Sequence, residues 1–172
     1  MQGNPDDEMK GRIIIEGGVM RDFKAYNNTL ALINTLPALA TLQSPGFSKE
    51  GFTIKEGVVE YRQQKERILL DSIYIKGGTA TIVGKGYLNL KKQTIHIDLA
   101  IQTARKLGKI LGSLPLVGYI ITGKDKSITI GLKIRGSIKQ PKVQTSAARE
   151  ILSLPLKIIK RTLESPAHII NR

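Results

Sequence analysis

The stretches "TIHIDLAIQ", residues 94–102, and "SITIGLKIRGSIK", residues 127–139, decide the fold of this 172-residue chain. In both stretches nearly every second residue is apolar. These residues are Ile95, Ile97, Leu99 and Ile101 in the first stretch and Ile128, Ile130, Leu132 and Ile134 in the second. Because successive side chains of a β-strand point to opposite faces, the alternation predicts two strands of a sheet with one apolar face.

Three strand-like segments precede this pair, at residues 52–61, 67–76 and 79–90, and shorter ones lie at residues 12–15 and 19–21. The connecting sequences "RQQKE", "GG" and "KKQ" are short enough for hairpin turns, which join antiparallel strands. We therefore predict an α+β fold that is mostly β. Its centre is a curved antiparallel sheet, an open groove or half-barrel, with short apolar helices covering it.

Three segments are predicted to be helical. Residues 22–42 have apolar residues at helical spacing, and residues 104–121 are apolar but divided into short turns by Gly and Pro. Residues 146–172 are predicted to form an amphipathic C-terminal helix. We expect the first two segments to cover the apolar face. Residues 1–10 are expected to be a lead that is disordered or foreign to the domain, so residues 11–145 form one β-groove domain.

The residue types that catalysis and metal binding require are scarce. The chain has no cysteine, and its two histidines lack a nucleophile or metal-ligand partner at a useful spacing. The sequence "GYIITGKD", residues 118–125, has the spacing of a phosphate-binding loop. However, Asp125 stands where that loop needs Ser or Thr, and a strand follows where it needs a helix. We therefore predict no enzyme, no metal and no cofactor.

Positive charge is concentrated in the second half of the chain. Residues 1–86 contain 11 Lys and Arg against 10 Asp and Glu, whereas residues 87–172 contain 16 against 4. Such a surface suits anionic lipid headgroups, an acidic protein or a nucleic acid, and it also simply keeps a sheet protein soluble. The candidate headgroup- or anion-binding residues are Lys124, Lys126, Lys133, Arg135, Lys139, Lys157, Lys160 and Arg161.

Three runs of the sequence together resemble the C-terminal region of AsmA-like proteins, a Gram-negative envelope group that includes AsmA, TamB and YhdP. The runs are "INTLPALATLQSPGFSKEGFTIKEGVVEY", "DSIYIKGGTATIVGKGYLNLKKQTIHIDLAIQT" and "GKILGSLPLVGYIITGKDKSITIGLKIRGSIKQPKV". The resemblance covers about residues 13–145. It implies a trough-shaped sheet with an apolar interior, part of a periplasmic bridge that is anchored in the inner membrane and carries phospholipid toward the outer membrane.

We therefore expect a non-catalytic lipid-binding module of the periplasm or cell envelope, anchored through an N-terminal region absent from this chain. Acyl chains would lie in a groove of the eight alternating Ile and Leu residues, with headgroups at the basic residues. Expected partners are phospholipid or an anionic membrane surface, and another envelope protein through an edge strand or the C-terminal helix.

Two alternatives remain open. One is a basic protein that binds polyanions or nucleic acid, although only Tyr87 and Tyr119 are available for base stacking in the second half. The other is a structural docking module that uses an edge strand.

Overall fold

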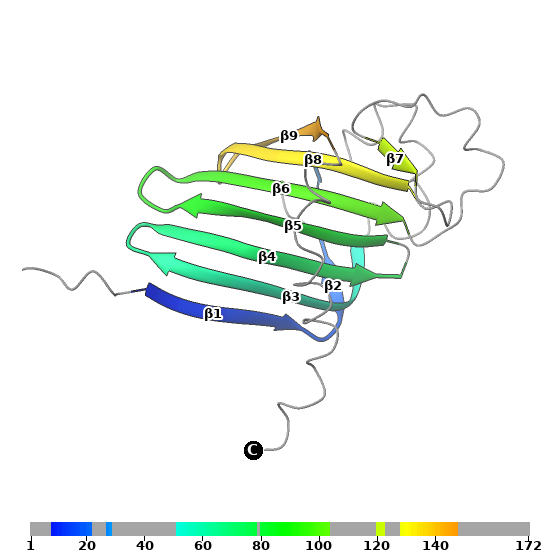
Figure 1. Cartoon of the computed structure of the whole chain (residues 1–172), viewed down its shortest axis with the longest axis horizontal. Helices are drawn as coiled ribbons and strands as arrows, with labels where there is room; N and C mark the ends of the chain where they lie inside the picture. Colours follow the sequence, from blue (N-terminus) through cyan, green and yellow to red (C-terminus); the bar gives the residue numbers. More distant parts are fainter. Residues whose placement is uncertain are drawn as a thin grey trace, which may run out of the picture.

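The computed structural model describes residues 8–21, 27–28, 51–78, 80–103, 120–122 and 128–147. The strands in these residues are β1 (Glu8–Ile15), β2 (Gly18–Met20), β3 (Phe52–Gln64), β4 (Arg67–Gly77), β5 (Ala80–Asn89), β6 (Thr94–Thr103), β7 (Ile120–Thr122), β8 (Ile128–Ser137) and β9 (Pro141–Ser146). They form one sheet in the order β1-β3-β4-β5-β6-β8-β7, with β2 also paired to β3 and β9 to β8 (Figure 1). Every pair is antiparallel.

Each outer edge of the sheet consists of two short strands in line. β1 and β2 pair with β3 in one continuous register, from Glu8 opposite Gln64 to Met20 opposite Phe52. Gly17, at φ 104°, interrupts this ladder in a conformation that glycine adopts easily. At the other edge, β7 and β9 pair with successive parts of β8.

The register of the sheet gathers the apolar residues on one face. The cross-strand pairs between β6 and β8 are Ile97 with Ile134, Leu99 with Leu132, and Ile101 with Ile130. The same face continues into β5, β4 and β3 through Ile82, Ile75, Ile73 and Val59. The alternation in the two defining stretches therefore predicted the shared face correctly.

The sheet is strongly curved toward this apolar face. The Asn28 side-chain amide donates a 2.5 Å hydrogen bond to the carbonyl oxygen of Pro141, at the start of β9. In a flat sheet, the six steps from β2 to β9 would span about 29 Å at the usual strand spacing. The seven residues from Arg21 to Asn28 reach about 25 Å at most, and strand offset adds further distance. The two edges must therefore approach each other.

Two bulges and a corner strand produce part of this curvature. The β3 register shifts between Ile54 and Glu56, and the β4 register shifts around Asp71. Beyond the first bulge, Phe52 is fully buried in the apolar cluster that also contains Ile101 of β6. Bulges bend the strand that carries them, so the start of β3 folds over the apolar face. Figure 1 shows this corner, with β2, behind the main sheet.

The close approach of β5 to β6 depends on two glycines. A Cβ at Gly84 would collide with the carbonyl oxygen of Asp98, and one at Gly86 would collide with the carbonyl oxygen of His96. These are backbone atoms, which cannot move aside as a flexible side chain does. The sequence "GKG" at residues 84–86 thus permits the close approach of β5 to β6.

The predicted fold class is confirmed in its β part, an open, curved antiparallel sheet. Several strand ends shift by one to three residues, and β3 continues to Gln64, into the predicted turn. Three boundaries between the predicted segments also differ. β1 begins at Glu8, inside the expected lead, because its first residue is held by β3 side chains. Ile120 and Ile121, expected in the helical insert, belong to β7. β7 pairs with Ile128–Ile130 of β8, the part of that strand to which β9 does not pair. Ser146, expected in the C-terminal helix, is the last residue of β9.

The predicted helices otherwise fall outside the described residues. Of residues 22–42, the structure describes Asn27 and Asn28, which are helical in conformation. Ala147 is described and is not helical, and the rest of the segments 22–42, 104–121 and 146–172 remains a prediction.

We predict that Gly84→Ala lowers the free energy of unfolding by about 2–3 kcal/mol, because the new methyl group overpacks the β5–β6 interface. Gly78→Ala is the matched control, since a Cβ there meets only the Lys55 side chain, at 3.9 Å. Urea unfolding of both variants measures the difference. Equal stability of the two variants would show that the strands do not approach so closely.

Candidate functional site

The concave face of the sheet carries a contiguous set of apolar side chains, which we call the apolar trough. Its described members include Ile13, Val59, Leu70, Ile73, Ile75, Ile82, Ile95, Ile97, Leu99, Ile101, Ile130, Leu132 and Ile134. Seven of the eight predicted groove residues lie in the trough. The side chain of the eighth, Ile128, lies outside the described residues.

Part of the trough is closed by the protein itself. Ile101, Ile130 and Leu132 are at most 2% exposed, in one cluster with Phe52. Ile95 and Ile134 are also buried, in a second cluster with partly buried Leu88, Ile138 and Val143 against it. These five predicted groove residues are therefore core residues in this structure.

The remainder of the trough is only partly covered. Ile97 and Leu99 are half-buried, as are Val59 and Leu70 on the neighbouring strands β3 and β4. Ile13, at the β1 edge of the same face, is 51% exposed. We call these five residues the open floor. The sequence pattern missed Leu70 because the Asp71 bulge breaks the alternation of β4. It missed Ile13 because β1 ends in three consecutive isoleucines, which show no alternation.

Three hairpin turns border the apolar trough at one end of the sheet, on the left of Figure 1. We call this border the turn edge. Its members are Lys65, Glu66, Arg67, Leu90, Lys91, Lys92 and Lys139, all of them exposed. The prediction included Lys139 but not the others. The available signal was their position in the connecting sequences "RQQKE" and "KKQ".

The two predicted headgroup residues within β8 lie on the opposite, convex face. Arg135 forms a 2.5 Å ion pair with Asp98 and donates to the carbonyl oxygen of Ile97 at 2.7 Å. Lys133 lies directly opposite Asp98 on the neighbouring strand. Neither side chain borders the trough. The other predicted residues, Lys124, Lys126, Lys157, Lys160 and Arg161, lie outside the described residues.

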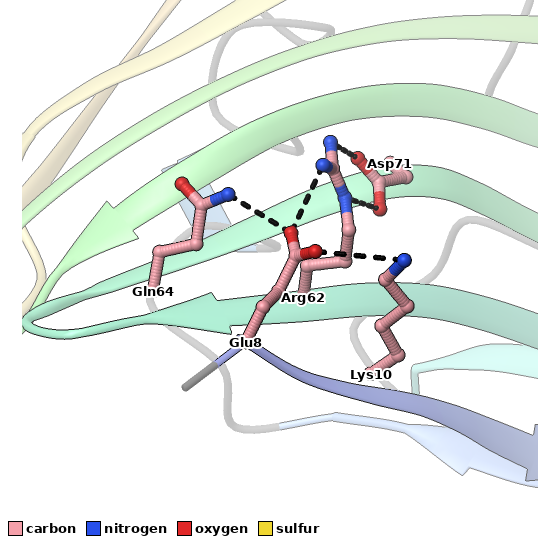
Figure 2. A network of polar contacts seen from close by, with 5 residues as sticks. All are labelled: Glu8, Lys10, Arg62, Gln64 and Asp71. Atoms are coloured by element: carbon pink, nitrogen blue, oxygen red, sulfur yellow. Dashed lines mark hydrogen bonds and ion pairs between the residues drawn. The ribbon is translucent and has the colours of Figure 1, made fainter. Parts of the chain in front are cut away.

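A network of polar contacts ties β1 to β3 and β4 on the convex face (Figure 2). The Arg62 guanidinium donates two 2.6 Å hydrogen bonds to the Asp71 carboxylate and one of 3.1 Å to the Glu8 carboxylate. Glu8 also accepts a 2.9 Å hydrogen bond from Gln64 and pairs with Lys10 at 3.5 Å. Because Lys10 lies directly opposite Arg62, Glu8 offsets the repulsion between two like charges.

A shallow depression of 630 Å³ lies beside this network and is lined by Lys10, Gly11, Arg12, Glu60, Arg62 and Asp71. Every charged residue of its lining forms an ion pair. Arg12 pairs with Glu60 at 2.7 Å. Each cation of the depression therefore already has a carboxylate partner. These ion pairs hold the edge strand β1 against β3 and β4, and they leave the depression poorly suited to binding an anion.

The surroundings of two residues on the convex face, Glu8 and Tyr74, shift their pKa values. The hydrogen bond from Gln64 lowers the pKa of Glu8 most, and Lys10 and Arg62 lower it further, against a smaller desolvation effect. Tyr74 belongs to an apolar cross-strand row of the convex face, with Val58 and Val83. Burial raises the pKa of Tyr74, and the charge of Glu56 raises it further.

The described part of the chain contains no cluster of side chains that could bind a metal ion, since no group of three or more His, Cys, Asp and Glu residues there could hold one. His96 stacks on Tyr87 at 4.8 Å, and its Nδ1 is buried without a hydrogen-bond partner. No described helix is long and apolar enough to cross a membrane.

The described part of the chain defines a mostly β protein class, an open, curved antiparallel sheet with apolar side chains gathered on one face. The chain matches the family of YhdP proteins over residues 1–143 and therefore belongs to the YhdP family. This family is part of the AsmA, TamB and YhdP group of Gram-negative envelope proteins, a non-enzymatic group of bridge-like transport proteins. No curated protein and no solved structure matches the chain.

We predict that Glu8→Gln destabilises the protein at neutral pH but less at acid pH. The folded pKa of Glu8 lies below the ordinary glutamate value of 4.5, so the carboxylate's stabilising contribution is present above that pH and is lost as pH falls through the folded pKa. Unfolding curves of both proteins between pH 7 and about pH 3 measure the gap. A gap that stays constant over this range would contradict the role assigned to the carboxylate.

Proposed function

We propose that the chain is a non-catalytic lipid-binding module of a longer envelope protein that moves phospholipid between the inner and outer membranes. Acyl chains would lie on the open floor of the apolar trough, and headgroups would remain at its border. An N-terminal membrane anchor would precede the module in the longer protein. The observation that carries this proposal is the open floor itself.

Physical reasoning favours an acyl chain as the ligand of this surface. Leaving a large aliphatic side chain exposed forgoes about 1.5–3 kcal/mol relative to burial. The half-buried residues of β3, β4 and β6 are contiguous with a fully packed core, so an acyl chain would extend that core. A saturated chain also needs no hydrogen-bond partner, and the strand backbone beneath it is already paired within the sheet.

The position of the cations supports a headgroup role at the turn edge. Lys65, Lys92 and Lys139 have no ion pair among the described residues, and all three are exposed. A phosphate at the border of the trough would meet these ammonium groups while its acyl chains lay inward. Lys133 and Arg135 are less well placed for this role, because they lie on the other face of the sheet.

We predict that lipid extraction and native mass spectrometry of the purified chain detect bound phospholipid, and that Ile13→Asp reduces it about tenfold or more. The reduction is expected because a carboxylate is costly in hydrocarbon. Ile14→Asp is the matched control. Ile13 and Ile14 are neighbours of the same type, 51% and 57% exposed, and they face opposite sides of β1.

Equal loss of lipid in both variants would assign the effect to β1 folding instead of the trough. No lipid in the wild-type chain, together with no uptake from added phospholipid, would overturn the proposed function.

We also predict that bound phospholipid persists when salt rises to about 1 M, since acyl burial is not screened. Binding of duplex DNA or RNA, if driven by the lysines, would fall steeply over the same range. Retention of lipid is measured after gel filtration at each salt concentration. A salt-sensitive interaction with nucleic acid and none with lipid would favour the polyanion alternative.

A further inference from the structure

The turn edge combines an exposed apolar tip with a surplus of cations. Leu90 is 38% exposed, and Lys91 and Lys92 follow it in the β5–β6 turn. The neighbouring turns add Lys65, Arg67 and Lys139, against the single carboxylate of Glu66. Aliphatic tips flanked by lysines are the arrangement that binds at the surface of anionic bilayers, with the apolar group at the level of the headgroups.

Hydrogen bonds make this edge a fixed surface. The Asn89 side chain accepts a 2.8 Å hydrogen bond from the backbone N–H of Lys92, and Gln93 donates from its side chain to the carbonyl of Leu90 at 2.6 Å. The N–H of Leu90 donates to the carbonyl of Glu66 in the β3–β4 turn at 2.8 Å. The N–H of Ile138 donates to the carbonyl of Gln93 at 2.9 Å. The three turns are thus linked side by side, and little order must be gained on docking.

The charge of the turn edge contrasts with that of the convex face over β1, β3 and β4. There, four carboxylates and four cations are all engaged in ion pairs. At the turn edge, Glu66 pairs with Lys91 at 3.2 Å, and Arg67 lies 5.7 Å from the ring centre of Tyr87. Within the part of the chain that the structure describes, Lys65, Lys92 and Lys139 have no ion-pair partner and can meet an external anion. Charge complementarity therefore points to an anionic surface.

We propose that the turn edge docks on the surface of an anionic phospholipid bilayer, with Leu90 at the headgroup level. Docking would bring this end of the apolar trough against the lipid reservoir, so that an acyl chain could enter without crossing water. This inference rests on the proposed function for its purpose, but the docking itself is measurable separately. A bilayer explains Leu90 as well as the lysines, whereas a nucleic acid would leave Leu90 unexplained.

The test is cosedimentation of the full chain with vesicles of phosphatidylglycerol and phosphatidylcholine in equal amounts. One variant carries Lys65→Gln, Lys92→Gln and Lys139→Gln. Its charge-matched control carries Lys85→Gln, Lys133→Gln and Lys142→Gln, which remove three cations from strands on the convex face. We expect the turn-edge variant to bind at least about tenfold more weakly than the wild type, and the control to bind within about threefold of it. Leu90→Gln should also weaken binding and make the remainder more salt-sensitive.

Equal losses in the two triple variants, or unchanged binding of the turn-edge variant, would overturn the docking proposal. Lipid bound to each purified variant is measured in parallel by native mass spectrometry. Docking lost while part of the bound lipid is retained supports both proposals, because the trough still holds acyl chains although three headgroup contacts are removed. Docking lost with all bound lipid retained would support docking and overturn the headgroup role of these three lysines. A chain that docks through the turn edge but carries and takes up no lipid would support docking and overturn the lipid-binding function.

Discussion

Cross-strand register is the constraint on which the rest of this structure depends. Ile97, Leu99 and Ile101 share a face with the apolar residues of β8 only because their pairing is fixed residue by residue. A slip of β6 by one residue would turn them to the charged face and bring His96 and Asp98 inward. The core, the open floor and the division of charge all follow from this one alignment.

Curvature converts that apolar face into a trough with a closed part and an open part. Phe52 closes one part because the β3 bulge turns it over the sheet, and Gly84 and Gly86 allow β5 and β6 to approach closely. The charged network around Arg62 holds β1 in register at the opposite side, where the floor remains open. The open floor thus extends from Ile97 and Leu99 of β6, beside the closed part, to Ile13 at the edge strand that this network holds.

The sequence predicted the strands and their apolar face because a period of two is a local signal that survives without tertiary information. It could not show which of the eight groove residues are core, since the burial of Ile130 and Leu132 depends on a corner formed by Phe52, far away in the chain. It also placed Lys133 and Arg135 at the border of the groove, although their parity puts them on the convex face. The turn lysines were passed over because adjacent hairpin turns become one surface only after the strands have paired.

The central claim is that lipid acyl chains contact the open floor and no other face, and a pair of adjacent positions tests it most directly. Leu70 lies on the trough face and Leu69 on the convex face of β4. Because the chain has no cysteine, single Leu70→Cys and Leu69→Cys variants can each carry one fluorescent label. Phospholipid brominated in its acyl chains should quench the label at position 70 and leave the label at position 69 nearly unchanged. Equal quenching at both positions, or none at position 70, would contradict the account.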